Sequence, residues 1–210
     1  MGNKSEHNVI SKFMIDNLEI IKPLLEFPHK DIFYFVQILQ RGKDNPELKM
    51  SNSRVIKTYY ITSLEKLETR YEEMQTLANM FNARVCINLN PRNFEKAGFK
   101  LLQKVANQMM NKDFYNIHKA YDSICGEYHS EIDKRWITDI DKDDLDKKNE
   151  IIGAINLIQN KDTTKGYKIL GIIPTKSGIH IISNPFNQQE FKKVYPKIDI
   201  HINNPTLLYY

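Results

Sequence analysis

Hydrophobic and polar residues alternate along three short segments in the last third of the chain, at 135–141, 175–181 and 197–202. A period of two is typical of a β-strand, in which residues two apart point to the same face of the sheet. Ile198 and Ile200 therefore share one face, while Asp199 and His201 share the other. The pattern predicts that the three segments form one sheet with an apolar face and a polar face.

The polar face of this predicted sheet carries acids and a histidine. Asp139 and Asp141 lie two residues apart, so their side chains project together. His180 stands between two isoleucines and points away from the face that they share. We expect Asp139, Asp141 and Asp199 to form a carboxylate cluster with His180 beside it.

The rest of the chain is predicted to contain further helices and strands. A helical pattern over 10–27 is interrupted by Pro23, and a capping box from Thr62 to Glu65 predicts the start of a helix that runs to about residue 82. The acids at 143, 144 and 146 are predicted to open a helix rather than to bind metal. The remaining predictions are strands at 32–40, 54–61, 84–89, 167–174 and 179–183, helices at 94–111 and 114–125 with Gly126 as a stop, and an apolar segment at 206–210.

These predictions indicate a mixed α/β (α+β) fold. The chain of 210 residues shows no repeat and no linker rich in proline or glycine. Its length suits one ordinary domain, and the best seam lies near 111–130. We therefore expect a single two-lobed domain over 1–210, with approximate lobes 9–112 and 130–210.

Composition narrows the function classes only slightly. The chain is 41% hydrophobic and 27% charged, with a net charge of +4, which is compatible with a polyanionic partner without requiring one. The two cysteines show no CxxC spacing, so neither a zinc site nor a disulfide framework is predicted. No apolar run approaches the length of a membrane span. We expect a cytoplasmic protein with no membrane partner.

Three motifs in this order resemble those of the archaeo-eukaryotic primase superfamily, which includes primase-polymerases and the polymerase domains of bacterial end-joining ligases. The motifs are Asp139-Ile140-Asp141, then Ser177-Gly178-Ile179-His180, then Ile198-Asp199-Ile200. The resemblance covers roughly the C-terminal third of the chain. It implies an RNA-recognition-motif-like antiparallel sheet in the C-terminal half, with a helix-and-strand N-terminal lobe packed beside it.

The resemblance also implies roles for these residues. In that family the first and third motifs supply acids that bind metal, so Asp139, Asp141 and Asp199 would be catalytic residues holding Mg²⁺ or Mn²⁺. The second motif binds the phosphates of the incoming nucleotide. Ser177 and His180, helped by Lys176, would hold the triphosphate here.

The partners implied by the resemblance are a single-stranded nucleic acid template and nucleoside triphosphates. A helicase or another replication protein is a further candidate partner. The N-terminal half tends to contact the template in primase-polymerases, so Arg92 is a candidate for binding nucleic acid phosphates. An ordinary solvated helix start is the alternative for Arg92.

The residue types fit two-metal nucleotidyl transfer, because magnesium and manganese prefer oxygen ligands and paired acids in a strand repel unless a cation joins them. The same acids also suit other functions. A metal-dependent nuclease would use them on a phosphodiester, and a non-catalytic nucleic-acid-binding module would keep the fold alone. Solvated acids at strand ends are the alternative without a metal.

Overall fold

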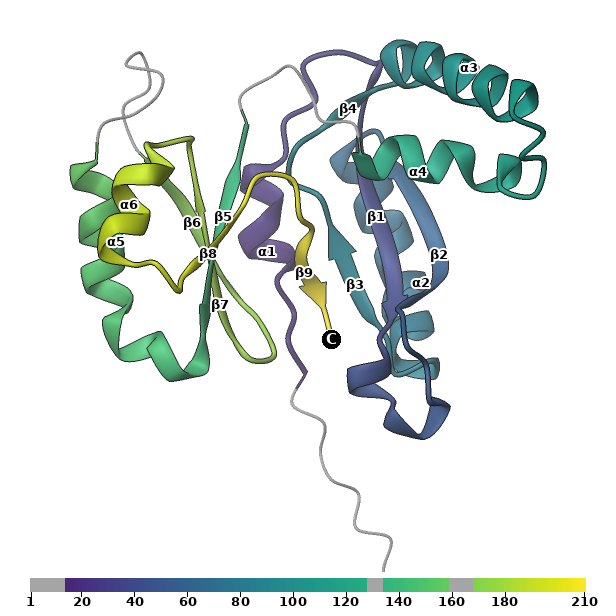
Figure 1. Cartoon of the computed structure of the whole chain (residues 1–210). Helices are drawn as coiled ribbons and strands as arrows, with labels where there is room; N and C mark the ends of the chain where they lie inside the picture. Colours follow the sequence, from purple (N-terminus) through teal and green to yellow (C-terminus); the bar gives the residue numbers. More distant parts are fainter. Residues whose placement is uncertain (1–13, 128–133, 159–167) are drawn as a thin grey trace, which may run out of the picture.

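The computed structural model of the chain describes residues 14–127, 134–158 and 168–210. In it two antiparallel sheets stand side by side, and the short helix α1 (Leu18–Ile21) contacts a strand of each (Figure 1). Helices and antiparallel sheets together make an α+β fold, as the sequence predicts. Among the described residues, none of the helices combines the length and the apolar character needed to cross a membrane.

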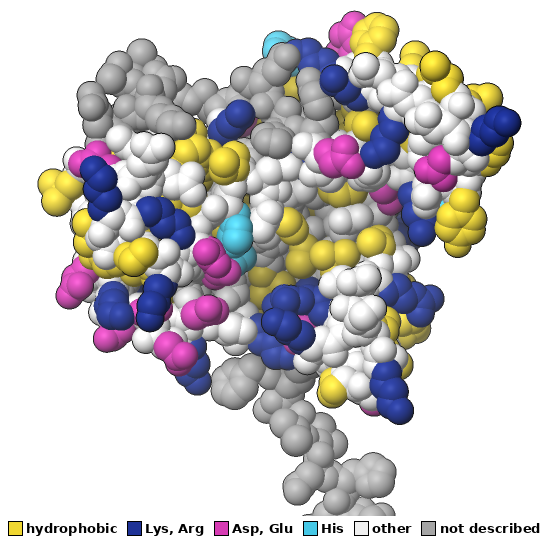
Figure 2. All heavy atoms as spheres, in the orientation of Figure 1, with side chains coloured by type: hydrophobic (Ala, Val, Ile, Leu, Met, Phe, Trp, Pro, Cys, Tyr) yellow, Lys and Arg dark blue, Asp and Glu magenta, His cyan; other side chains and the backbone are white. Residues whose placement is uncertain are grey.

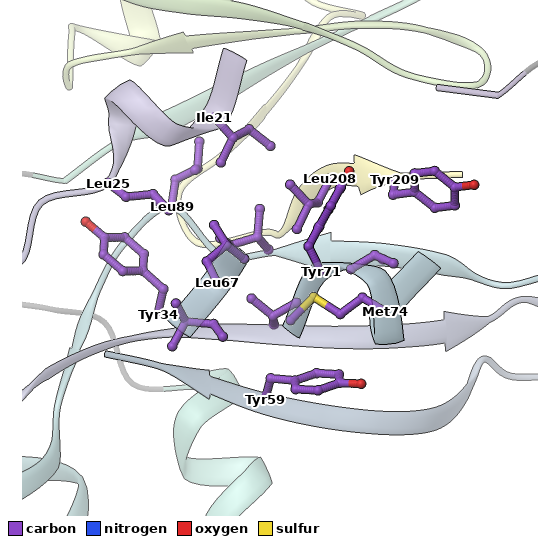
Figure 3. Close-up of a cluster of buried hydrophobic side chains, with 14 of the residues drawn as sticks. Ile21, Leu25, Tyr34, Tyr59, Leu67, Tyr71, Met74, Leu89, Leu208 and Tyr209 are labelled. Atoms are coloured by element: carbon purple, nitrogen blue, oxygen red, sulfur yellow. The ribbon is translucent and has the colours of Figure 1, made fainter. Parts of the chain in front are cut away.

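The first sheet has the strand order β2-β1-β3-β9. The helix α2 covers one of its faces, because the buried residues of α2 recur at helical spacing and meet the alternate residues of β1. Figure 3 shows Leu67, Tyr71 and Met74 of α2 in one core with Tyr34 of β1 and Leu208 of β9. The elements are β1 (Ile32–Gln40), β2 (Arg54–Ile61), β3 (Arg84–Ile87), β9 (Thr206–Tyr209), the two-residue β4 (Arg92–Asn93), which pairs with β1, and α2 (Leu64–Met80).

The opposite face of the first sheet is covered only in part. A hairpin of α3 (Phe94–Met110) and α4 (Ala120–Glu127) lies over one end of it (Figure 1). Cys125 of α4 packs there against Phe33 and Phe35. The short helix η4 (Ile117–Lys119) leads into α4. At the other end of this face β1 runs into the helices η2 (Gly42–Asp44) and η3 (Pro46–Leu48), and no helix formed by the described residues covers the sheet there.

The second sheet has the strand order β6-β7-β5-β8 and is built from a β-α-β-β-α-β sequence of elements. Its outer face is apolar, and both α-helices of the unit pack there through Ile151, Ile155 and Phe191. The elements are β5 (Trp136–Asp141), η5 (Lys142–Lys147), α5 (Lys148–Leu157), β6 (Ile169–Pro174), β7 (Gly178–Ser183), α6 (Gln188–Val194) and β8 (Asp199–His201).

The inner face of the second sheet is divided between packing and polar groups. Ile137, Ile173 and Ile182 belong to the same core as α2 and the first sheet, so the two sheets share one hydrophobic core. The alternate positions farther along these strands carry Asp139 and His180. The shared core therefore fixes the polar half of the second sheet against the first sheet.

Several elements differ from the predictions. The helical segment predicted over 10–27 reduces to α1 and the short η1 (Lys22–Leu24), in which Pro23 fits the first turn, and residues 10–13 lie outside the described residues. Ser63 rather than Thr62 caps α2, since its side chain accepts a hydrogen bond from the Lys66 amide. Gly126 does not stop α4, which includes it.

The end of the chain also departs from the predicted lobes. The predicted apolar segment at 206–210 contains β9 (Thr206–Tyr209), which pairs with β3 of the first sheet and not with the second sheet. The range 130–210 is therefore not one lobe, because its last strand completes the other. Tyr210 follows β9 and is buried near the boundary between the sheets.

Gly178 is required by the close approach of β7 to β5. A Cβ at this position would lie 2.0 Å from the carbonyl oxygen of Ile140. Gly178→Ala is expected to lower the free energy of unfolding by about 2–3 kcal/mol, because the backbone of β5 would have to move. Gly153→Ala is the control, since its Cβ would meet nothing within 4 Å in α5, and it is expected to gain about 0.5–1 kcal/mol. Denaturant unfolding measures both, and a Gly178→Ala protein as stable as wild type would contradict this account.

Candidate functional site

The strand register places Asp139 between His180 and Asp199. Asp139 is the direct cross-strand partner of His180 on β7 and of Asp199 on β8. Directly opposed residues in antiparallel strands have Cβ atoms about 5 Å apart and share a face of the sheet. Ile198 packs in the core on the other face. Asp139, His180 and Asp199 therefore occupy adjacent positions on one face of the sheet, as the alternation predicts.

A pocket of about 770 Å³ opens between this polar face and the uncovered end of the first sheet. Asp139 and Asp141, here called the acidic wall, line it together with His180 and Ser177. Figure 2 shows acidic and histidine side chains at the left edge of a central hollow, and a group of Lys and Arg side chains at its lower edge. The cationic residues that line the pocket, here called the basic wall, are Arg41, Lys43, Arg84 and Lys176.

Asp139 is in an environment that disfavours its charge. Burial raises the pKa of its carboxyl group, and the negative charges of Asp141 and Asp199 raise it further, although His201 opposes them. A divalent cation between Asp139 and Asp141 would remove this repulsion, and carboxylate oxygens are the ligands that magnesium and manganese prefer. The two carboxylates of the acidic wall would supply part of the ligand set that such an ion needs.

Asp199 does not join the acidic wall directly. Its side chain is 73% exposed, and its Oδ1 lies 3.8 Å from the Nζ of Lys192 on α6. In the described ranges 14–127, 134–158 and 168–210, no three His, Cys, Asp or Glu side chains converge closely enough to hold a metal ion together. Asp199 would therefore have to turn from Lys192 toward Asp139 to act as a third ligand.

His180 is held by neighbours on both sides of its ring. Its Nδ1 lies 2.8 Å from the Oγ1 of the buried Thr206, and its Nε2 lies 3.5 Å from the Oδ1 of Asp139. Burial, followed by the charges of His201 and Arg84, lowers the pKa of His180 to about 4. The imidazole is therefore neutral at pH 7 in the unliganded protein, and one ring nitrogen faces the acidic wall.

Lys176 and Ser177 occupy the turn between β6 and β7. The ammonium of Lys176 donates to the Oδ1 of Asp44 at 2.8 Å and to the hydroxyl of Tyr210 at 2.7 Å. It also lies over the Tyr210 ring, 4.5 Å from the centroid. The exposed Ser177 lines the pocket, and its carbonyl accepts a hydrogen bond from the Lys142 amide. The structure therefore brings both residues to the pocket, with Lys176 already paired.

Sequence reasoning missed Asp44 and most of the basic wall. Asp44 accepts two hydrogen bonds from Arg84, at 2.7 and 2.9 Å, in addition to the one from Lys176. The segment that holds Arg41, Lys43 and Asp44 follows the strand predicted at 32–40, and the sequence predicts no site there. Its charge run was a weak signal, because nothing in the spacing links it to residues about a hundred positions later.

The ionisation of Asp44 makes the free energy of unfolding depend on pH in the acidic range. Burial raises the pKa of its carboxyl, but the hydrogen bonds and charges of Arg84 and Lys176 outweigh burial and hold it at about 2, against 3.8 for a free side chain. Because the folded pKa is the lower one, the contribution is complete above pH 3.8 and is lost as the pH falls toward 2. We expect it to be about 2 kcal/mol.

Thermal unfolding of wild type and Asp44→Asn between pH 6 and pH 2 measures this contribution. The variant should be less stable near neutral pH, and the gap should close as the pH falls below 4. A gap that stays constant over this range would show that Asp44 does not titrate with a lowered pKa.

Arg92 does not fit the predicted role in binding nucleic acid. Its side chain is fully buried. The guanidinium donates to the carbonyl of Cys125 at 2.8 Å, to the carbonyl of Asn90, and to the Oδ1 of Asn203 at 3.1 Å. Arg92 therefore joins α4 to the segment before β9, and no surface is left from which it could meet a phosphate. The solvated helix start is equally wrong for this residue, because β4 turns its side chain inward.

Comparison with protein-family models, with curated proteins and with solved structures finds no match for this chain.

Proposed function

We propose that the chain is a template-dependent nucleotidyltransferase, a primase or primase-polymerase that uses two divalent ions, Mg²⁺ or Mn²⁺. The observation that carries the proposal is the position of Asp139 beside both His180 and Asp199, at a pocket with a basic wall. A pocket with carboxylates on one side and cations on the other suits a ligand that is itself a metal ion bound to a polyphosphate.

Asp139 and Asp141 would hold the ions, with Asp199 joining them by leaving Lys192. Bound there, the ions would activate the attacking hydroxyl group and neutralise charge on the leaving phosphate oxygens. His180 would donate to a phosphate oxygen at the edge of the acidic wall, since its Nε2 lies 3.5 Å from the Oδ1 of Asp139 while its Nδ1 contacts Thr206. The chain's own contribution is thus a carboxylate platform whose geometry is set by the register of three strands.

The triphosphate would lie between the acidic wall and the turn at 175–178. Ser177 offers a hydroxyl group and Lys176 an ammonium group at this turn. The exposed Lys43 and the partly exposed Arg41 line the same pocket from the first sheet. Cations there would bind phosphate oxygens that the metal ions leave exposed.

The architecture also supports the proposal. The resemblance to the archaeo-eukaryotic primase superfamily implies an RNA-recognition-motif-like sheet beside a helix-and-strand lobe. The β-α-β-β-α-β order of the second sheet, with both helices on one face, is in keeping with that expectation. A cytoplasmic location is part of the proposal, and the free thiols of Cys86 and Cys125 agree with a reducing compartment.

An incorporation assay tests the proposed activity. The protein is incubated with Mn²⁺, one labelled nucleoside triphosphate and a homopolymer single-stranded template, and the four nucleotides are compared in turn on each template. We expect labelled products only with the nucleotide complementary to the template. Metal-dependent shortening of the template without incorporation would favour the nuclease, and template binding without either reaction would favour the non-catalytic module.

A further inference from the structure

Asp44 is a buried carboxylate whose cationic partners also face the pocket. Its side chain is only 4% exposed, and Arg84 binds it through two parallel hydrogen bonds. Lys176, whose side chain is 40% exposed, adds a third hydrogen bond to the Oδ1 atom. The two partners therefore differ in how easily they can leave, because Arg84 is enclosed and bidentate whereas Lys176 reaches Asp44 from the rim.

Asp44 would keep a cationic partner if Lys176 moved away to bind a ligand. Arg84 would still neutralise the carboxylate, so no unpaired charge would be left in the interior. Lys176 would also keep its place next to Tyr210, whose hydroxyl and ring both contact the ammonium. The ammonium of Lys176 can therefore exchange partners at low cost.

The rest of the basic wall is ready for an anion. Within the described part of the chain, Arg41 and Lys43 make no ion pair, and both line the pocket that Lys176 faces. Arg41, Lys43 and Lys176 line this one pocket, so an anion with several phosphate groups has more charged oxygens to offer these cations than a single phosphate group has. A single phosphate group therefore gains less from taking Lys176 away from Asp44.

We propose that Asp44 is a specificity-determining residue that competes with the ligand for Lys176, so that the pocket accepts a polyphosphate chain and rejects single phosphate groups. This inference rests on the proposed function for the identity of the ligand, a nucleoside triphosphate. Asp44 acts here as an internal substitute for a phosphate group. An anion must therefore bind the basic wall strongly enough to displace Asp44 from Lys176.

Titration calorimetry with inorganic tripolyphosphate and with orthophosphate tests the inference, in the presence of a metal chelator and at low salt. Asp44→Asn keeps the shape of the side chain and removes its charge. We expect this variant to bind tripolyphosphate about fivefold more tightly than wild type and orthophosphate more tightly by a larger factor, so that the selectivity for the longer anion falls. Asp122→Asn is the control, because this acid is bound by Tyr60 and Thr58 away from the pocket, and it should change neither affinity.

Lys176→Ala separates competition from a general charge effect. In this background Asp44→Asn should no longer strengthen tripolyphosphate binding, because the contested cation is gone. An Asp44→Asn protein that is folded by circular dichroism but binds tripolyphosphate no better than wild type would overturn the inference, as would an equal gain in the Lys176→Ala background.

The inference and the proposed function fail in different experiments. If Asp44→Asn binds tripolyphosphate more tightly but wild type shows no template-dependent incorporation, the role of Asp44 is supported and the polymerase activity is contradicted. If wild type incorporates nucleotides but Asp44→Asn does not change anion binding, the polymerase activity is supported and the role of Asp44 is contradicted.

Discussion

Asp139→Ala is expected to abolish nucleotide incorporation, with a loss of about a thousandfold or more. The reason is that a carboxylate ligand would be lost from ions that supply several kcal/mol of transition-state stabilisation. Asp139 is the residue that the strand register places at the centre of the site. Single-nucleotide incorporation on a homopolymer template, followed over hours for the variant, measures the ratio of rates.

The same substitution should not destabilise the unliganded protein. The pKa of Asp139 is raised by burial and by the charge of Asp141, so its removal relieves an unfavourable charge in the fold. The thermal midpoint of Asp139→Ala should equal or exceed that of wild type without metal, and Mn²⁺ should raise only that of wild type. Asp146→Ala, in η5, is the control and should retain activity. An inactive variant with a large loss of stability would point to a structural role for Asp139.

His180→Ala is expected to weaken nucleoside triphosphate binding by about tenfold to a hundredfold. This range corresponds to the loss of a hydrogen bond to a charged group, about 1.5–3 kcal/mol. The ring is neutral in the unliganded protein because its pKa lies near 4. A bound phosphate would raise this pKa and favour a cationic ring that donates to phosphate oxygen. Titration of the nucleotide with Mn²⁺ present measures the change.

The metal affinity of His180→Ala distinguishes two roles of the imidazole. If the ring binds phosphate, Mn²⁺ binding without nucleotide should stay within about threefold of wild type. Thr206→Val is the matched variant, since it removes the hydroxyl beside Nδ1 and leaves the ring in place. Nucleotide affinity equal to wild type in His180→Ala would mean that the ring contacts no phosphate.

The polar face of the second sheet was predictable because strand periodicity is local. Alternation at 135–141 and 197–202 is enough to assign Asp139 and Asp199 to one face and Ile198 to the other, and the structure confirms it. The resemblance of the three motifs, in their order, to the primase superfamily further predicted that these strands belong to one sheet. The side-chain direction of Asp199, toward Lys192, was not predictable because it depends on where α6 packs.

The basic wall and the interior place of Arg92 depend on contacts between distant parts of the chain. Arg84 and Lys176 meet through Asp44 only because two sheets share a core, and no spacing in the sequence encodes that contact. Arg92 follows a proline in a loop that reads as exposed, yet its pairing in the short β4 turns the guanidinium toward Cys125. The pairing of β9 with the first sheet was not predictable either, because the apolar residues of this strand do not indicate which sheet it joins.

Mn²⁺ binding followed by electron paramagnetic resonance tests the central claim most directly, because free Mn²⁺ gives a strong signal that weakens on binding. We expect wild type to bind Mn²⁺ and to bind it more tightly when a nucleoside triphosphate is present. Asp139→Ala and Asp141→Ala should each lose this binding, while Asp146→Ala should keep it. Equal Mn²⁺ binding by wild type, Asp139→Ala and Asp141→Ala would contradict a metal site at the acidic wall and with it the proposed polymerase.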